Sequence, residues 1–134
     1  MGTSVFKPGF RLSVVDAAVL TLGIGCAGWS FSRWGIVSFV LLFVIGHFFL
    51  FCNVLRMSRK PELIWTATFL GLSIATLRFG QPGWLATALL SLMMTVVLAV
   101  LETRKVFYHG ILWQRLNPQL PDWFEKNTGR SELQ

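Results

Sequence analysis

Charged side chains are scarce in this chain: Asp, Glu, Lys and Arg make up only 13% of its 134 residues. A soluble domain carries about 25% charged residues, so the chain lacks the polar surface that water requires. Hydrophobic residues reach 54% and the mean hydropathy is +0.61, which also excludes a disordered chain, because disordered segments are poor in apolar side chains. The composition predicts an integral membrane protein.

Cysteine and catalytic motifs are scarce as well. Cys26 and Cys52 belong to no CxxC pair, and their expected depths in neighbouring helices differ by roughly 20 Å, too far for a disulfide. The sequence contains no nucleophile–base set, no metal-spaced cluster of His, Cys, Asp and Glu, and no phosphate loop. A GxGxxG match at residues 23–28 lies inside an apolar run and indicates helix packing. We therefore expect neither an enzyme nor a metal site.

Apolar runs divide the rest of the chain into expected membrane helices at about 12–32, 35–55, 62–79 and 83–102. The second and fourth lie in the uncharged runs 34–55 and 79–101, of 22 and 23 residues, enough to cross a bilayer core, which needs roughly 20. The third has only 15 uncharged residues, so a re-entrant segment is the alternative there. Short Gly- and Pro-containing or polar turns separate the helices in pairs.

These features predict an all-α, integral membrane four-helix bundle made of two antiparallel transmembrane hairpins. Residues 1–105 form the expected transmembrane domain, and residues 106–134 form a cytoplasmic amphipathic tail with an interfacial helix. The tail mixes aromatic and basic residues, and Trp123 and Phe124 can dock under the bundle or against a partner.

The cations are sorted by side. With four spans, eight share one side and only Arg33 and Arg78 face the other; the eight are Lys7, Arg11, Arg56, Arg59, Lys60, Arg104, Lys105 and Arg115. The positive-inside rule then predicts that both termini are cytoplasmic, and we expect a bacterial cytoplasmic (inner) membrane. The net charge of +6 indicates contact with anionic lipid of the bilayer rather than with nucleic acid.

Small residues spaced four apart mark seams where membrane helices can touch. Such rows occur in the fourth, third and first expected helices; the predicted packing residues are Thr87, Ser91, Thr95 and Ala99, then Ala67, Gly71 and Ala75, and finally Ala17, Thr21 and Gly25. The rows serve either packing within the chain or contact with another chain.

Three polar residues stand out within the apolar runs. His47 is expected near the midplane, where a neutral imidazole can ligate haem or a chlorophyll-type pigment; the alternative is a hydrogen bond to another helix. Asp16 and Asn53 are expected at similar depth in neighbouring helices, where they form a candidate proton- or cation-binding pair. The alternative for Asp16 is a pairing with a nearby cation or a helix N-terminus.

Three functions follow from these residues. The favoured one is a small multi-pass protein that acts through interactions, as an accessory or structural subunit of a membrane complex or as a homo-oligomer. The alternatives are a small proton- or cation-coupled transporter that uses Asp16, and cofactor binding through His47.

Overall fold

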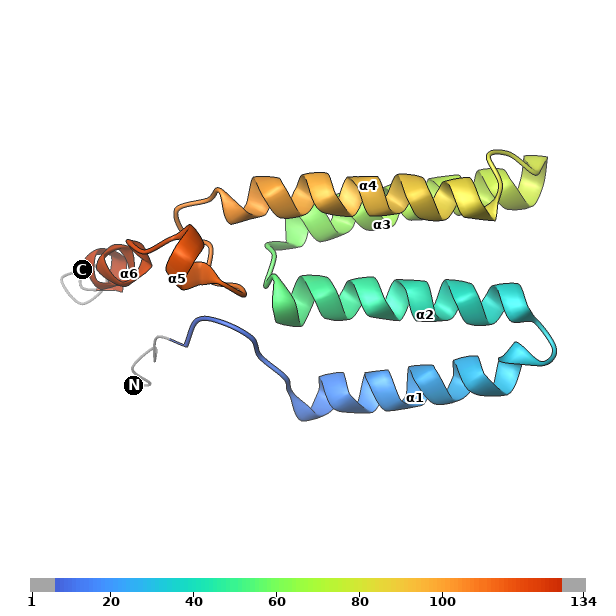
Figure 1. The fold of residues 1–134 in the computed structure, drawn as a ribbon, viewed down its shortest axis with the longest axis horizontal. Helices are drawn as coiled ribbons and strands as arrows, with labels where there is room; N and C mark the ends of the chain where they lie inside the picture. The colour runs from blue at the N-terminus through green and yellow to red at the C-terminus, as the bar shows by residue number, and fades with distance from the viewer. Residues whose placement is uncertain (1–6, 129–134) are drawn as a thin grey trace.

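The structure, a computed structural model, describes residues 7–128, and every regular element in that range is a helix (Figure 1). The elements are α1 (Val14–Phe31), α2 (Gly35–Phe49), the π-helical segment η1 (Leu50–Val54), α3 (Arg59–Phe79), α4 (Trp84–Thr103), α5 (Trp113–Leu116) and α6 (Leu120–Thr128). With η1 counted as the continuation of α2, the four long helical stretches match the predicted ranges to within three residues at every end. The all-helical class is therefore confirmed.

Three helical stretches are long and apolar enough to cross a membrane: α1, α2 continued by η1, and α4. At 21 residues, α3 is also long enough to cross, but it is less apolar. Arg59, Lys60 and Glu62 fill its first turn, and Arg78 lies in its last. Whether α3 crosses the membrane is thus a question of the polar residues at its ends and not of its length.

α1 and α2 pack closely because α1 offers small residues to α2. A Cβ added to Gly23 would lie 2.1 Å from Cδ1 of Ile45, so the glycine makes room for that side chain. Farther along, the hydroxyl groups of Ser30 and Ser38 lie 2.8 Å apart, and both residues are buried. Small and hydroxyl side chains of this kind allow close contact between helices in lipid.

The end of α2 widens into η1, which the sequence pattern did not predict. The backbone N–H of Leu55 donates to the carbonyl of Leu50 at 2.8 Å, the five-residue spacing of a π-helix. Arg56 then ends the helix with a φ of +47°. Isolated π-helical turns occur frequently at functional sites, and this one places Phe51 and Asn53 in buried positions.

A core of aromatic and apolar side chains joins α2, η1, α3 and α4. Its buried members are Phe51, Trp65, Phe69 and Leu98. α3 and α4 also pack directly along their length, and the hydroxyls of Thr76 and Thr87 lie 2.9 Å apart between them. This core holds α3 and α4 against α2.

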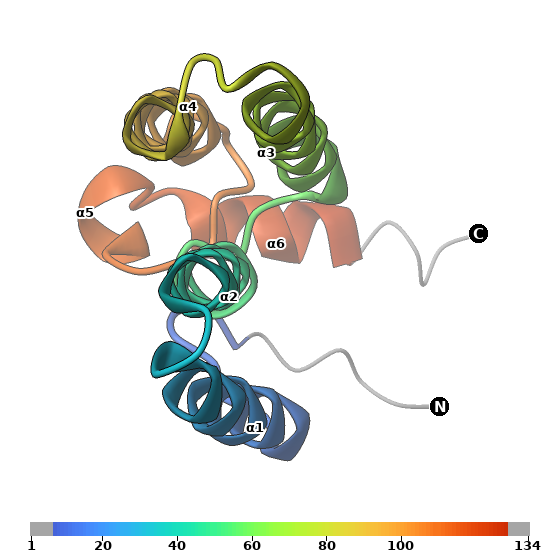
Figure 2. The same cartoon turned by 90° about the vertical axis from the view of Figure 1, so that its right-hand side faces the viewer.

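The four long helices do not form the compact bundle expected from the sequence. Seen along their axes, α2 lies between α1 on one side and the α3–α4 pair on the other (Figure 2). Among the long helices α1 packs extensively only on α2, and 11% of its residues are buried, against 28% in α4. Phe43 of α2 packs on Trp65 and Phe69 of α3, and α1 lies at the edge of an open array.

The chain gathers most of its cations at one end, called here the basic end (residues 7–13, 55–60 and 104–127). The connections α1–α2 and α3–α4 lie at the opposite end, and the N-terminal segment, α5 and α6 lie at the basic end (Figure 1). The eight predicted cations thus share the basic end, while Arg33 and Arg78 lie at the other. The charge asymmetry is therefore a property of the folded chain.

The C-terminal segment is docked against the helix ends. The N–H of Ile111 donates to the carbonyl of Val54, and the N–H of Gly9 donates to the carbonyl of His109, both at 2.8 Å. A Cβ on Gly110 would lie 2.4 Å from the carbonyl oxygen of Leu55, so only glycine permits this close approach. Of the tail's aromatic residues, Trp123 packs on Phe107 in the loop after α4 at a centroid distance of 6.3 Å.

Candidate functional site

His47 lies within an aromatic cluster between α2 and α3. Its ring stacks on Trp65 at a centroid distance of 4.4 Å and packs on Phe43 at 4.3 Å, while Phe51 meets it edge-on at 5.8 Å. Trp65 in turn stacks on Phe69 and donates its indole N–H to the carbonyl of Ser91 on α4 at 3.1 Å. His47 is therefore part of the core that ties α2 to the α3–α4 pair.

The two ring nitrogens of His47 have different surroundings. Nδ1 lies 2.8 Å from the carbonyl oxygen of Phe43, one turn earlier in α2. Because a carbonyl only accepts, Nδ1 carries the proton of the neutral ring. Nε2 is buried and has no hydrogen-bond partner. It is the atom that would ligate a cofactor, and Trp65 covers the ring to which it belongs.

Asp16 and Asn53 come together at the basic ends of α1 and η1. With its amide nitrogen facing the carboxylate, Asn53 donates to Oδ2 of Asp16 at 2.9 Å and to the carbonyl of Arg11 at 2.5 Å. The same oxygen of Asp16 accepts from the backbone N–H and the hydroxyl of Ser13, at 2.8 and 2.6 Å. The backbone N–H of Asp16 donates in return to the hydroxyl oxygen of Ser13 at 3.1 Å, and this bond and the Ser13 N–H bond to Asp16 form a capping box at the start of α1.

The small-residue rows divide into two groups. In α4, Thr87, Ser91 and Thr95 are buried against α3. In α3 the residues that face its neighbours are instead Trp65, Phe69, Ser73 and Thr76. The predicted row of Ala67, Gly71 and Ala75 lies on another face, with Ala67 and Gly71 exposed and Ala75 half-buried.

The row of Ala17, Thr21 and Gly25 in α1 is likewise exposed, because the neighbouring stripe of Gly23, Ala27 and Ser30 contacts α2. The sequence pattern identified the rows of small residues but could not tell which of two adjacent helix faces would pack against a neighbouring helix. In α3 the packed face is the one that contacts the aromatic side chain of Phe43 on α2.

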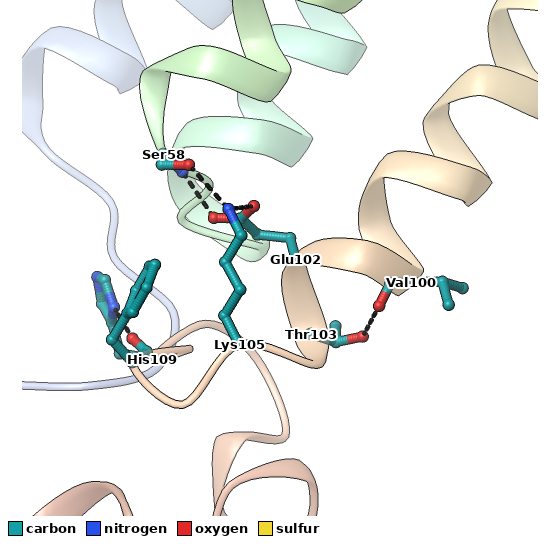
Figure 3. Close-up of polar contacts among 7 residues, drawn as sticks. Ser58, Val100, Glu102, Thr103, Lys105 and His109 are labelled. Carbon is teal, nitrogen blue, oxygen red and sulfur yellow. Dashed lines mark hydrogen bonds and ion pairs between the residues drawn. The ribbon is translucent and has the colours of Figure 1, made fainter. Parts of the chain in front are cut away.

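Glu102 is a buried acid that the sequence analysis did not single out. It is 3% exposed, pairs with Lys105, and accepts the backbone N–H of Ser58 at 3.0 Å (Figure 3). Lys105 also donates to the hydroxyl of Ser58 at 3.3 Å. The group fastens the start of α3 to the end of α4. Its sequence signal was the single acid at the end of the last apolar run.

A basic pocket of about 810 Å³ opens at the basic end. Its walls come from the N-terminal segment, the connection between η1 and α3, the loop after α4, and α6. The lining residues are Lys7, Pro8, Phe10, Arg11, Arg56, Phe107, His109, Leu120, Trp123 and Phe124. Sequence reasoning placed the cations on one side of the membrane and allowed Trp123 and Phe124 to dock under the bundle or against a partner, but it did not bring the two groups together in one cavity. The pocket depends on the docking of the tail.

No family model, curated protein or solved structure matches the chain at a significant level. Within residues 7–128, no three His, Cys, Asp or Glu side chains gather as a metal site would require. Function must therefore be argued from the helices, their exposed faces and the basic pocket.

Proposed function

We propose that this protein is a small multi-pass subunit of the bacterial cytoplasmic membrane that acts through helix–helix contacts, either with further copies of itself or with other membrane subunits. The proposal includes four spans, with α3 crossing, cytoplasmic termini and a non-catalytic role. The observation that carries it is the pair of small-residue rows that face outward from α1 and α3.

These rows are open to close approach. A Cβ added at Gly25 or at Gly71 would meet no atom within 4 Å, and Ala17, Thr21 and Ala67 beside them are exposed. In lipid no hydrophobic force drives helices together, so association depends on the close contact that small residues allow. The rows in α4 and on the inner face of α1 already serve the chain itself, and the outward rows are available to another chain.

The open arrangement of the helices supports the same proposal. α1 is supported on one side only, by α2. A second chain that packs against α1 would complete its surroundings without any change within the first chain.

The test replaces an outward-facing glycine by leucine. The single chain has room for the larger side chain, but a partner helix packed against that face would clash with it. Gly71→Leu and Gly25→Leu add bulk to the outward rows, whereas Gly46→Leu adds the same bulk to an exposed site of α2 that also has no neighbour within 4 Å. Crosslinking in native membranes should recover oligomers or a co-purifying subunit for the unaltered chain and for Gly46→Leu. We expect at least a fivefold loss of that product for the other two variants.

Recovery of monomer alone from native membranes would contradict the proposal. Equal product from all four chains would show that the outward rows are not the contact surface. Thermal unfolding of each variant in detergent verifies that the single chain remains folded.

A further inference from the structure

The basic pocket combines a cationic wall with an apolar one. Lys7, Arg11 and Arg56 supply three cationic side chains, and none of the lining residues within 7–128 is acidic. Phe10, Phe107, Trp123 and Phe124 supply aromatic surface. A ligand that matches both walls must carry a negative charge and an apolar portion.

The three cations are held without counter-ions. Among residues 7–128 the ion pair formed is that of Glu102 with Lys105, and none of the three takes part in one. Asp16 acts on Arg11 only at longer range, and its carboxylate is already held by Ser13 and Asn53. The positive charge of the pocket is therefore not neutralised by the described chain.

Arg56 lines this pocket from a backbone conformation that is unfavourable for a residue with a side chain. Its φ of +47° is unusual for a residue other than glycine, and strained backbone of this kind concentrates at binding sites. Its guanidinium donates to the carbonyl of Lys7 at 2.6 Å. Arg11 lines the same cavity, and partial burial and then the charge of Arg11 lower the pKa of Arg56.

The location of the pocket narrows the class of ligand. Arg11 lies three residues before α1 begins, and Arg56 lies two residues after η1 ends. Both therefore lie where membrane helices leave the apolar core, at the depth of lipid headgroups. Arginine side chains match phosphate oxygens through several N–H donors at once, and aromatic side chains favour this interface.

We propose that the pocket binds the phosphate group of an anionic amphiphile, namely a phospholipid headgroup of the phosphatidylglycerol type. Arg11, Arg56 and Lys7 bind the phosphate, and Phe107 and Trp123 contact the glycerol and the first methylene groups. The site is separate from the outward rows of α1 and α3, so its test is independent of subunit assembly.

The test measures binding to the purified full chain in detergent by isothermal titration calorimetry. The probes are dihexanoyl-phosphatidylglycerol, dihexanoyl-phosphatidylcholine, which has the same tails and no net charge, and inorganic phosphate. We expect saturable binding of the phosphatidylglycerol probe with at least tenfold weaker binding of the other two. Phosphate that binds as tightly, and at the same residues, would support the phosphate site but identify a soluble source for its ligand.

Variants locate the binding. Arg11→Gln and Arg56→Gln should each raise the dissociation constant about tenfold, which corresponds to about 1.4 kcal/mol of binding free energy. The control Arg59→Gln lies at the same end but outside the cavity, and it should change the dissociation constant less than twofold. Arg56→Lys keeps the charge without the paired donors and should fall between. Arg11→Gln leaves the Arg56–Lys7 bond intact, so it remains informative if Arg56→Gln unfolds. Absence of binding in every arm, or equal losses in Arg11→Gln and Arg59→Gln, would overturn the proposal.

Discussion

At the scale of single residues, the core between α2 and α3 contains a polar ring that uses only one of its two nitrogens. Nδ1 of His47 is bonded to the carbonyl of Phe43, whereas Nε2 has no partner. A buried acceptor without a donor costs free energy. The ring must therefore contribute through its packing on Phe43 and Trp65, through a ligand at Nε2, or through both.

Substitution of His47 separates these roles. His47→Ala removes a ring packed on both faces, and the cavity should lower stability by about 3 kcal/mol. His47→Phe keeps the ring and removes the unpaired nitrogen, so we expect it to match or exceed the original stability. Thermal unfolding in detergent, followed by near-ultraviolet circular dichroism, measures both changes.

A bound cofactor would make His47→Phe less stable than the original chain instead of equally or more stable. If Nε2 ligated haem, cells grown with haem would yield a coloured protein with a Soret band, and His47→Phe would abolish it. Because Nε2 is itself buried within the described chain, we expect a colourless preparation from both chains.

At the scale of elements, the boundaries of the helices could be predicted, but their contacts could not. Charged residues and Gly–Pro turns fix where an apolar run stops, so the ends of α1 and α4 were found within two residues. The face that α3 turns to its neighbours depends on which side chains fill the space beside α2. Trp65 and Phe69 fill it, whereas the periodicity of small residues marked the adjacent face with Gly71.

η1 had no sequence signal for a related reason. Its residues continue the apolar run of α2, and a π-helical turn changes backbone hydrogen bonds without changing composition. In the structure this turn ends where Asn53, which the sequence already suggested as a partner of Asp16, reaches that residue and joins the end of the helix to the start of α1.

Exchange of the acid and the amide tests the contact between Asp16 of α1 and Asn53 of η1. Asn53→Ala removes a buried donor, and we expect a loss of about 1–3 kcal/mol. Asn53→Asp should be worse at neutral pH, because two carboxylates would then face each other where a 2.9 Å hydrogen bond stood. The pair Asp16→Asn with Asn53→Asp restores one acid and one amide and should recover most of the stability.

The same variants bear on transport by Asp16. The combined variant moves the acid to the other helix, and a capping role survives that exchange more easily than an ion pathway does. No recovery of the unfolding midpoint in the combined variant would show that the carboxylate is needed at Asp16 itself. Proton-coupled flux in liposomes that Asp16→Asn abolishes would then support the transporter.

At the scale of the whole molecule, the distribution of charge predicted which residues lie at each end of the helices. It did not predict that the C-terminal tail docks at the basic end. The separation of eight cations from Arg33 and Arg78 needs only the order of spans, which the sequence shows. The docking of the tail depends on Gly110 approaching the carbonyl of Leu55 and on Asn117, whose amide bonds to the carbonyls of Val106 and Tyr108. Such single close contacts leave no periodic pattern, so the basic pocket could not be predicted.

The docked tail keeps Tyr108 out of water. Its ring is 2% exposed, and its hydroxyl donates to the carbonyl of Ile111 at 3.0 Å. Burial, and then the charge of Glu102, raise the pKa of Tyr108. The neutral phenol is therefore the form that suits the docked tail, and its stabilising effect is complete below the ordinary pKa and declines as pH rises above it.

The orientation of the whole molecule is tested by the labelling of single cysteines. In a chain with Cys26→Ala and Cys52→Ala, Arg33→Cys and Arg78→Cys lie at one end and Arg115→Cys at the other. The charge bias predicts that a membrane-impermeant maleimide labels the first two in intact cells, and labels the third only after permeabilisation. Labelling of Arg115→Cys alone in intact cells would reverse the orientation. Arg78 decides the role of α3: labelling at Arg33 without labelling at Arg78 would mean that α3 enters the membrane without crossing it.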